Sequence, residues 1–148
     1  MMDKQQYQVR QAVFTDLALL KKVFLLTRRD TFYWQPASFF NIDQIEKAFC
    51  KETIFLAEEK KGQIVGFVSI YEKEKPLFIH HFFVLPTYQR KGVGQILMQT
   101  LLDKFALPYR LKCLIKNEKA IAFYLKNNWY AVEEGICEEG NYLVLELS

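Results

Sequence analysis

Long apolar runs are missing from this sequence of 148 residues. None reaches the roughly 20 apolar residues that a membrane-spanning helix requires. The polar start, Met1 to Gln6, also lacks the apolar segment of a secretory signal. We therefore expect a cytoplasmic protein with no membrane partner.

Cysteine and histidine are also scarce. The three cysteines, Cys50, Cys113 and Cys137, are odd in number and do not follow the spacing of metal ligands. The two histidines, His80 and His81, are neighbours in the chain and have no further ligand at a suitable spacing. We expect reduced thiols and no metal site.

Positive charge exceeds negative charge only slightly, with a formal net charge of +3. A nucleic-acid-binding protein usually concentrates more positive charge on one face, so we expect no nucleic acid partner. Hydrophobic residues make up 51% of the chain, and no repeat, low-complexity tract or linker interrupts it. These features predict one globular domain over residues 1–148.

Apolar periodicity and turn residues predict the order β-α-α-β-β-β-α-β-α-β-β, an α/β fold whose mixed sheet has helices on both faces. Strands are expected at residues 7–10, 53–58, 63–71, 77–84, 109–115, 129–132 and 142–147. Helices are expected from Thr15 as N-cap to residue 28, from Asn41 or Asp43 to residue 49, at residues 93–105, and from Asn117 as N-cap to residue 127.

The most informative stretch connects the expected strand at 77–84 to the helix that follows it. Its residues 89–94 read Gln-Arg-Lys-Gly-Val-Gly. Unpaired N–H groups and the helix dipole attract an anion to a helix N-terminus. Gly92 and Gly94 have no Cβ, so a phosphate can approach the backbone closely. Because Arg90 and Lys91 add positive charge, this stretch predicts a phosphate-binding loop.

Two common nucleotide-binding loops do not fit this stretch. The sequence has no Gly-Lys-Ser or Gly-Lys-Thr of a Walker loop, and Leu97 stands where a dinucleotide fingerprint has its third glycine. The pattern that fits is Q-x-x-G-x-G at residues 89–94, preceded by Val84-Leu85-Pro86. It resembles the pyrophosphate loop of the GNAT superfamily of N-acetyltransferases.

The resemblance continues downstream, where the family has a strand ending near Asn, a helix with Phe-Tyr and a Gly-Phe-like pair. This chain has Asn117, then Phe123-Tyr124, then Asn128-Trp129. Asn128 departs from the usual glycine but also tolerates the left-handed conformation that ends a helix. The resemblance implies the GNAT fold and acetyl-coenzyme A as co-substrate.

The resemblance also implies how acetyl-coenzyme A is bound. In the family, the pantetheine arm pairs with the strand before the loop, and a backbone N–H, here near Phe83 or Val84, polarises the thioester carbonyl. The implied set of cofactor-binding residues is Phe82, Phe83, Val84, Gln89, Arg90, Lys91, Gly92, Val93, Gly94, Gln95, Asn117 and Tyr124.

Tyr124 is the expected general acid that protonates the leaving thiolate of coenzyme A. It lies seven residues after Asn117, so the two side chains share one face of the expected helix. A free phenol has a pKa of about 10 and a thiol about 8.5, so burial or hydrogen bonding must assist the proton transfer. The alternative for Tyr124 is a packed aromatic side chain with no catalytic role.

A general base is also required, because a primary amine with a pKa of about 10.4 is protonated at neutral pH. Simple alternation puts His80 and His81 on opposite faces of their strand. His80 shares its face with Val84, and the arylalkylamine branch of the family has a proposed proton-relay histidine at the corresponding offset, which favours His80. A β-bulge would invert this alternation and favour His81.

The implied reaction is direct transfer of an acetyl group to a primary amine in a ternary complex, since Cys113 has the setting of a core residue. The acceptor, a small molecule or a peptide, is left open, as is the choice between monomer and homodimer. The alternative function is a non-catalytic sensor of acyl-coenzyme A. An aromatic acceptor pocket, or simply core, is expected from Phe32, Tyr33, Trp34, Phe39 and Phe40.

Overall fold

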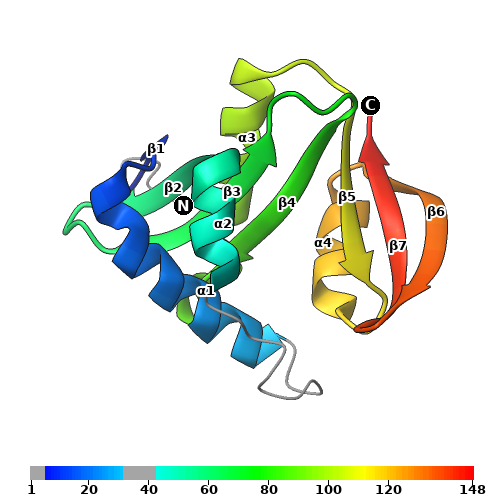
Figure 1. Cartoon of the computed structure of the whole chain (residues 1–148), viewed down its shortest axis with the longest axis horizontal. Coiled ribbons are helices and arrows are strands. Elements are labelled where there is room, and N and C mark those ends of the chain that lie inside the picture. Colours follow the sequence, from blue (N-terminus) through cyan, green and yellow to red (C-terminus); the bar gives the residue numbers. More distant parts are fainter. Residues whose placement is uncertain (1–5, 32–42) are drawn as a thin grey trace.

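The computed structural model describes residues 6–31 and 43–148. Within them, seven strands form one sheet in the spatial order β1-β2-β3-β4-β5-β7-β6 (Figure 1). Every neighbouring pair is antiparallel except β4 and β5, which are parallel. The strands are β1 (Tyr7–Gln11), β2 (Thr53–Glu59), β3 (Ile64–Tyr71), β4 (Leu77–Val84), β5 (Tyr109–Leu114), β6 (Tyr130–Cys137) and β7 (Gly140–Leu147).

Helices cover both faces of this sheet, with α1 and α2 on one face and α3 and α4 on the other (Figure 1). The expected element order and the mixed sheet are therefore confirmed. No helix in the described ranges is long and apolar enough to cross a membrane. The helices are α1 (Leu17–Thr31), α2 (Asp43–Lys51), α3 (Val93–Lys104) and α4 (Glu118–Lys126), with short 3₁₀ turns η2 (Phe14–Asp16) and η4 (Pro86–Tyr88) before α1 and α3.

Alternating side chains of the central strands supply a hydrophobic core on each face of the sheet. Phe55 and Val68 belong to the core under α3 and α4, whereas their chain neighbours Leu56 and Phe67 belong to the core under α1. Because both faces are covered, β3 is buried along nearly its whole length. Ser69 is the polar exception among these buried side chains of β3.

The edge strand β6 is longer than the sequence predicts. It continues to Cys137, well beyond the expected end at residue 132, and pairs with β7 along its length. Most of its side chains are exposed, and Glu133 and Glu134 stand among them. An exposed edge strand needs no alternation of apolar and polar residues, so the pattern that reveals a half-buried strand is absent here.

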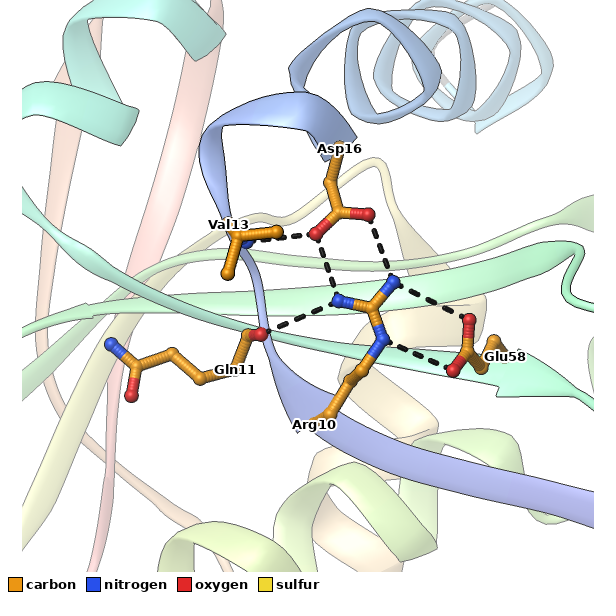
Figure 2. A network of polar contacts seen from close by, with 5 residues as sticks. All are labelled: Arg10, Gln11, Val13, Asp16 and Glu58. Carbon is orange, nitrogen blue, oxygen red and sulfur yellow. Dashed lines mark hydrogen bonds and ion pairs between the residues drawn. The ribbon is translucent and has the colours of Figure 1, made fainter.

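The start of α1 differs from the expectation that Thr15 is its N-cap. The 3₁₀ turn η2 precedes the helix, and the Asp16 carboxylate accepts a hydrogen bond from the backbone N–H of Val13 at 2.7 Å. The Arg10 guanidinium donates to both carboxylate oxygens of Asp16 at 2.8 Å and, through Nε, to Glu58 at 3.0 Å (Figure 2). One arginine thus joins β1, β2 and the start of α1.

Replacing Asp16 with asparagine should lower the free energy of unfolding at neutral pH by about 1.5–3 kcal/mol, the typical loss for a hydrogen bond to a charged group. Hydrogen bonding to Arg10 holds the pKa of Asp16 below its usual value, against the opposing effect of burial. A carboxyl with a lowered folded-state pKa stabilises the fold above its unfolded pKa, and this stabilisation is lost as the pH falls through the folded-state pKa. Urea unfolding should show the difference shrinking below about pH 4.

Glu133→Gln is the matched control for this measurement, since Glu133 is exposed on the edge strand β6. It should leave the free energy of unfolding unchanged, as surface substitutions usually do. An Asp16→Asn variant as stable as this control at neutral pH would contradict the assigned role of the Arg10 network.

Candidate active site

The sheet opens between β4 and β5. Their parallel pairing is limited to the first residues of each strand: Leu77 lies opposite Tyr109, Phe78 opposite Arg110, and Ile79 opposite Leu111. Beyond this point β4 continues along β3, and β5 continues along β7. Figure 1 shows the two strands close together where they begin and apart where they end. The second half of β4 therefore has one edge without a β5 partner among the described strands.

The hydrogen-bonding pattern fixes which backbone groups face this opening. Leu85 N–H donates to the carbonyl of Val65 at 2.8 Å, and antiparallel residues alternate between bonding to the partner strand and pointing away from it. Phe83 therefore bonds toward β3, while the backbone groups of Phe82 and Val84 point toward the opening. These two residues present an edge to which an extended chain can add.

The loop at residues 89–92 is tied to the end of this edge. Gln89 Nε2 donates to the carbonyl of Val84 at 3.1 Å. Arg90 and Gly92 both have positive φ, 63° and 86°, a conformation that glycine adopts without strain. Two left-handed residues so close together fold the chain back sharply, so that α3 begins directly beside the open edge of β4.

The N-terminus of α3 fits the predicted anion site. Its first intrahelical hydrogen bond runs from Ile96 N–H to the carbonyl of Gly92 at 3.1 Å. The N–H groups of the first helical turn have no side-chain cap within the described part of the chain. They are consequently available to an anion. Arg90 and Lys91 are exposed beside them.

Gly94 has a packing role that the sequence did not reveal. A Cβ at this position would lie 3.2 Å from Cζ of Phe123 and 3.5 Å from Cε1 of Phe82. The first turn of α3 therefore rests directly on aromatic rings from α4 and β4. The glycine brings the helix N-terminus, the open strand and α4 into one contact.

Tyr124 lies beneath the same contact. Its ring centroid is 6.1 Å from that of Phe82 and 5.5 Å from that of Trp129, and its side chain is 6% exposed. Burial raises the pKa of its hydroxyl far above the usual value. The phenol is therefore protonated at neutral pH, as a proton donor must be.

The ends of α4 agree with the sequence prediction. Asn117 Oδ1 accepts a hydrogen bond from the N–H of Ala120 at 3.3 Å, which makes Asn117 the N-cap. Asn128 has a φ of 73°, and Trp129 N–H donates to the carbonyl of Tyr124 at 3.0 Å. The left-handed residue at the end of the helix thus orients Trp129, which follows it.

The two histidines lie at a β-bulge. The register of β3 and β4 passes from Ser69 opposite His81 to Ile70 opposite Ile79, so His80 is the additional residue. Ile79 belongs to the core under α3. The His81 ring instead lies against the ring of Phe24 of α1, with 5.7 Å between the ring centroids. Ile79 and His81, two residues apart, thus face opposite sides of the sheet, so simple alternation does not hold across residues 79–81. The bulge that would favour His81 is present.

His81 and His80 have different surroundings. Nδ1 of His81 lies 2.9 Å from Ser69 Oγ and 3.7 Å from Glu52 Oε1, and the side chain is 15% exposed. Nε2 of His80 lies 2.5 Å from Glu74 at the protein surface. Sequence reasoning missed Glu52 and Ser69, although Ser69 is a polar residue in an otherwise apolar strand and so gave one signal.

Metal ligands and an acceptor pocket are the remaining subjects of the sequence expectations. No group of three or more potential metal ligands occurs in the residues that the structure describes. The predicted aromatic acceptor residues lie outside the described residues: Phe32, Tyr33, Trp34, Phe39 and Phe40.

Comparison with known families agrees with this geometry. The acetyltransferase (GNAT) family matches residues 20–129, which include the open strand, the glycine loop and α4. The chain therefore belongs to the GNAT acetyltransferase family.

Individual proteins are similar over most of the chain. The peptidyl-lysine N-acetyltransferase YiaC of Escherichia coli strain K12 is 36% identical over 102 residues, which are 68% of this chain and 64% of that protein. The match thus spans slightly less than two thirds of this relative.

Two solved structures share the fold. The apo form of YjaB from Escherichia coli has a TM-score of 0.80 at 18% identity, over 95% of this chain and 96% of that one. The PaiA N-acetyltransferase from Thermoplasma acidophilum in complex with coenzyme A has a TM-score of 0.77 at 16% identity, over 95% and 97%.

Cys113 should react with iodoacetamide at least about 100-fold more slowly than Cys50 at neutral pH, because the thiolate is the reactive form. Burial raises the pKa of Cys113 to about 12, whereas Cys50 is exposed. Mass spectrometry of the labelled peptides measures both rates in one sample. Equal rates in the folded protein would show that Cys113 is an accessible nucleophile after all.

Proposed function

We propose that this protein transfers an acetyl group from acetyl-coenzyme A to a primary amine. The observation that carries the proposal is the edge of β4 that has no strand partner in the described part of the chain. This edge ends at a glycine loop and at a helix N-terminus for which the same residues provide no side-chain cap. An extended arm with an anionic end fits this arrangement, and the pantetheine pyrophosphate of coenzyme A has that chemistry.

Each part of this arrangement has a proposed binding role. The N–H groups of Val93, Gly94 and Gln95, with Arg90 and Lys91, bind the pyrophosphate. The outward backbone groups of Phe82 and Val84 pair with the pantetheine arm as an added strand would. Gln89 holds the loop against β4, and Asn117 begins the helix that carries Tyr124.

Tyr124 is the proposed general acid. The acetyl carbon gains a bond to the amine nitrogen as its bond to sulfur breaks, and the sulfur leaves with the electron pair. A phenol that burial keeps protonated can donate its hydrogen to this sulfur. A raised phenol pKa opposes complete transfer, so the hydrogen bond to the departing sulfur is the larger part of the proposed contribution.

His81 is the proposed general base, in place of His80. An amine that remained protonated would add roughly 4–5 kcal/mol to the barrier, from about 3.4 pKa units at 1.36 kcal/mol each. His81 lies on β4 next to the open edge and is mostly buried, whereas His80 is paired with Glu74 at the surface. Water remains the alternative proton acceptor for this step.

Direct transfer in a ternary complex is the proposed kinetic mechanism. A covalent route through Cys113 would require a thiolate, and burial raises the pKa of this thiol to about 12. The amine therefore attacks the thioester itself. Because the similar YiaC is named a peptidyl-lysine N-acetyltransferase, a lysine side chain in a peptide is the first acceptor to test.

The test combines calorimetric titration with acetyl-coenzyme A and a thiol-release assay with a lysine-containing peptide and a panel of small amines. Binding together with acetylation of one acceptor supports the proposal. Binding without turnover on any amine favours the alternative, a non-catalytic acyl-coenzyme A sensor. Absence of binding by the folded protein would overturn both.

Replacing Tyr124 with phenylalanine should lower kcat by about 100-fold, a typical loss for a general acid. The affinity for acetyl-coenzyme A should remain within about threefold, because the ring contacts are retained. Tyr71→Phe is the matched control, since Tyr71 is an exposed tyrosine at the far end of β3, and it should change neither quantity. An unchanged kcat in Tyr124→Phe would assign the proton donor to water or another group.

A further inference from the structure

A small polar cluster interrupts the hydrophobic layer between the sheet and α1. Ser69 is fully buried, and the side chains of Glu52 and His81 are 14% and 15% exposed. The three residues come from β3, from the segment between α2 and β2, and from β4. The rings of Phe24 and Phe83 lie against His81 on its apolar sides.

Glu52 is the unusual member of this cluster. Its Oε1 atom is buried and has no hydrogen-bond partner among the described residues. Burial raises the pKa of this carboxyl, but His81, Ser69 and the charge of His80 lower it, and the net direction is downward. Glu52 is therefore an anion at neutral pH, held in a place where an unpaired charge is costly.

The position of this anion determines where His81 carries its proton. Both polar neighbours lie at Nδ1: Ser69 Oγ at 2.9 Å and Glu52 Oε1 at 3.7 Å. A carboxylate accepts hydrogen bonds and donates none. A hydrogen on Nδ1, donated to Ser69, places the positive end of the N–H bond beside the Glu52 anion, whereas a lone pair on Nδ1 would face that anion. Nε2 is then the nitrogen with the free lone pair.

We propose that Glu52 and Ser69 are positioning residues that hold the proton of His81 on Nδ1, so that Nε2 accepts the proton that the acceptor amine must lose. This inference rests on the proposed acetyl transfer and specifies its base. The ammonium group gives one proton to Nε2 and becomes a neutral amine, while His81 becomes a cation. The buried Glu52 carboxylate then faces a full positive charge and stabilises it.

The charged groups around His81 are consistent with this role. On β4, His80 is turned to the surface, where Glu74 pairs with it. The segment before β2 contributes Glu52, and α1 contributes a contact with the apolar ring of Phe24. Among the side chains that the structure describes, Glu52 is a carboxylate next to the His81 ring, and Glu74 is a matched carboxylate next to the other histidine.

The first test needs no acceptor. Nitrogen NMR of the His81 ring distinguishes the two neutral forms, and the wild type should carry its hydrogen on Nδ1. Glu52→Gln and Ser69→Ala should each shift the ring toward a mixture of the two forms. A wild-type ring with its hydrogen on Nε2 would overturn the inference, whatever the protein is found to catalyse.

The second test uses the lysine peptide or whichever amine of the panel is acetylated. Glu52→Gln should lower kcat by about tenfold, because the His81 cation formed in the reaction loses the carboxylate that stabilises it, and the acid limb of the kcat/KM profile should move to lower pH. The KM for acetyl-coenzyme A should not change. His81→Gln should remove this limb altogether.

Glu74→Gln is the matched control and should keep both kcat and the pH profile of the wild type. If Glu74→Gln, and not Glu52→Gln, lowered kcat and shifted the pH profile, His80 would be the base and the inference would be overturned. If the wild-type protein does not bind acetyl-coenzyme A, the proposed function is refuted. The NMR measurement would still decide which ring nitrogen of His81 carries the hydrogen.

Discussion

The separation of β4 from β5 is the feature on which the rest of the site depends. After Ile79, β4 stays with β3 and β5 stays with β7. An interior strand edge leaves backbone donors and acceptors that need partners. The elements around the opening converge on it: Gln89 bonds to Val84, Gly94 brings α3 against Phe82, and Phe82 contacts Tyr124.

The β-bulge at His80 determines which face of the sheet the later side chains of β4 point to. By inverting the alternation of faces, it leaves Phe82 packed toward α4 and turns His81 toward α1. The open backbone edge therefore lies between Tyr124 on one side of the sheet and His81 on the other. In the proposed reaction, the acid and the base act from opposite faces of the sheet, with the reacting thioester between them.

Features with a local cause could be predicted from the sequence. The left-handed Asn128, the cap at Asn117 and the glycine loop all follow from turn and capping chemistry within a few residues. The position of the bulge could not be predicted, because it depends on how β4 pairs with β3. The contact of Glu52 with His81 was also hidden, since it joins segments far apart in the sequence.

Hydrogen exchange of the β4 amides, measured with and without saturating acetyl-coenzyme A, tests most directly whether the open edge binds the co-substrate. The account predicts slower exchange at Phe82 and Val84, whose N–H groups face the opening. It predicts little change at Phe83, whose N–H bonds toward β3. Unchanged exchange at both Phe82 and Val84, with acetyl-coenzyme A bound, would contradict the account.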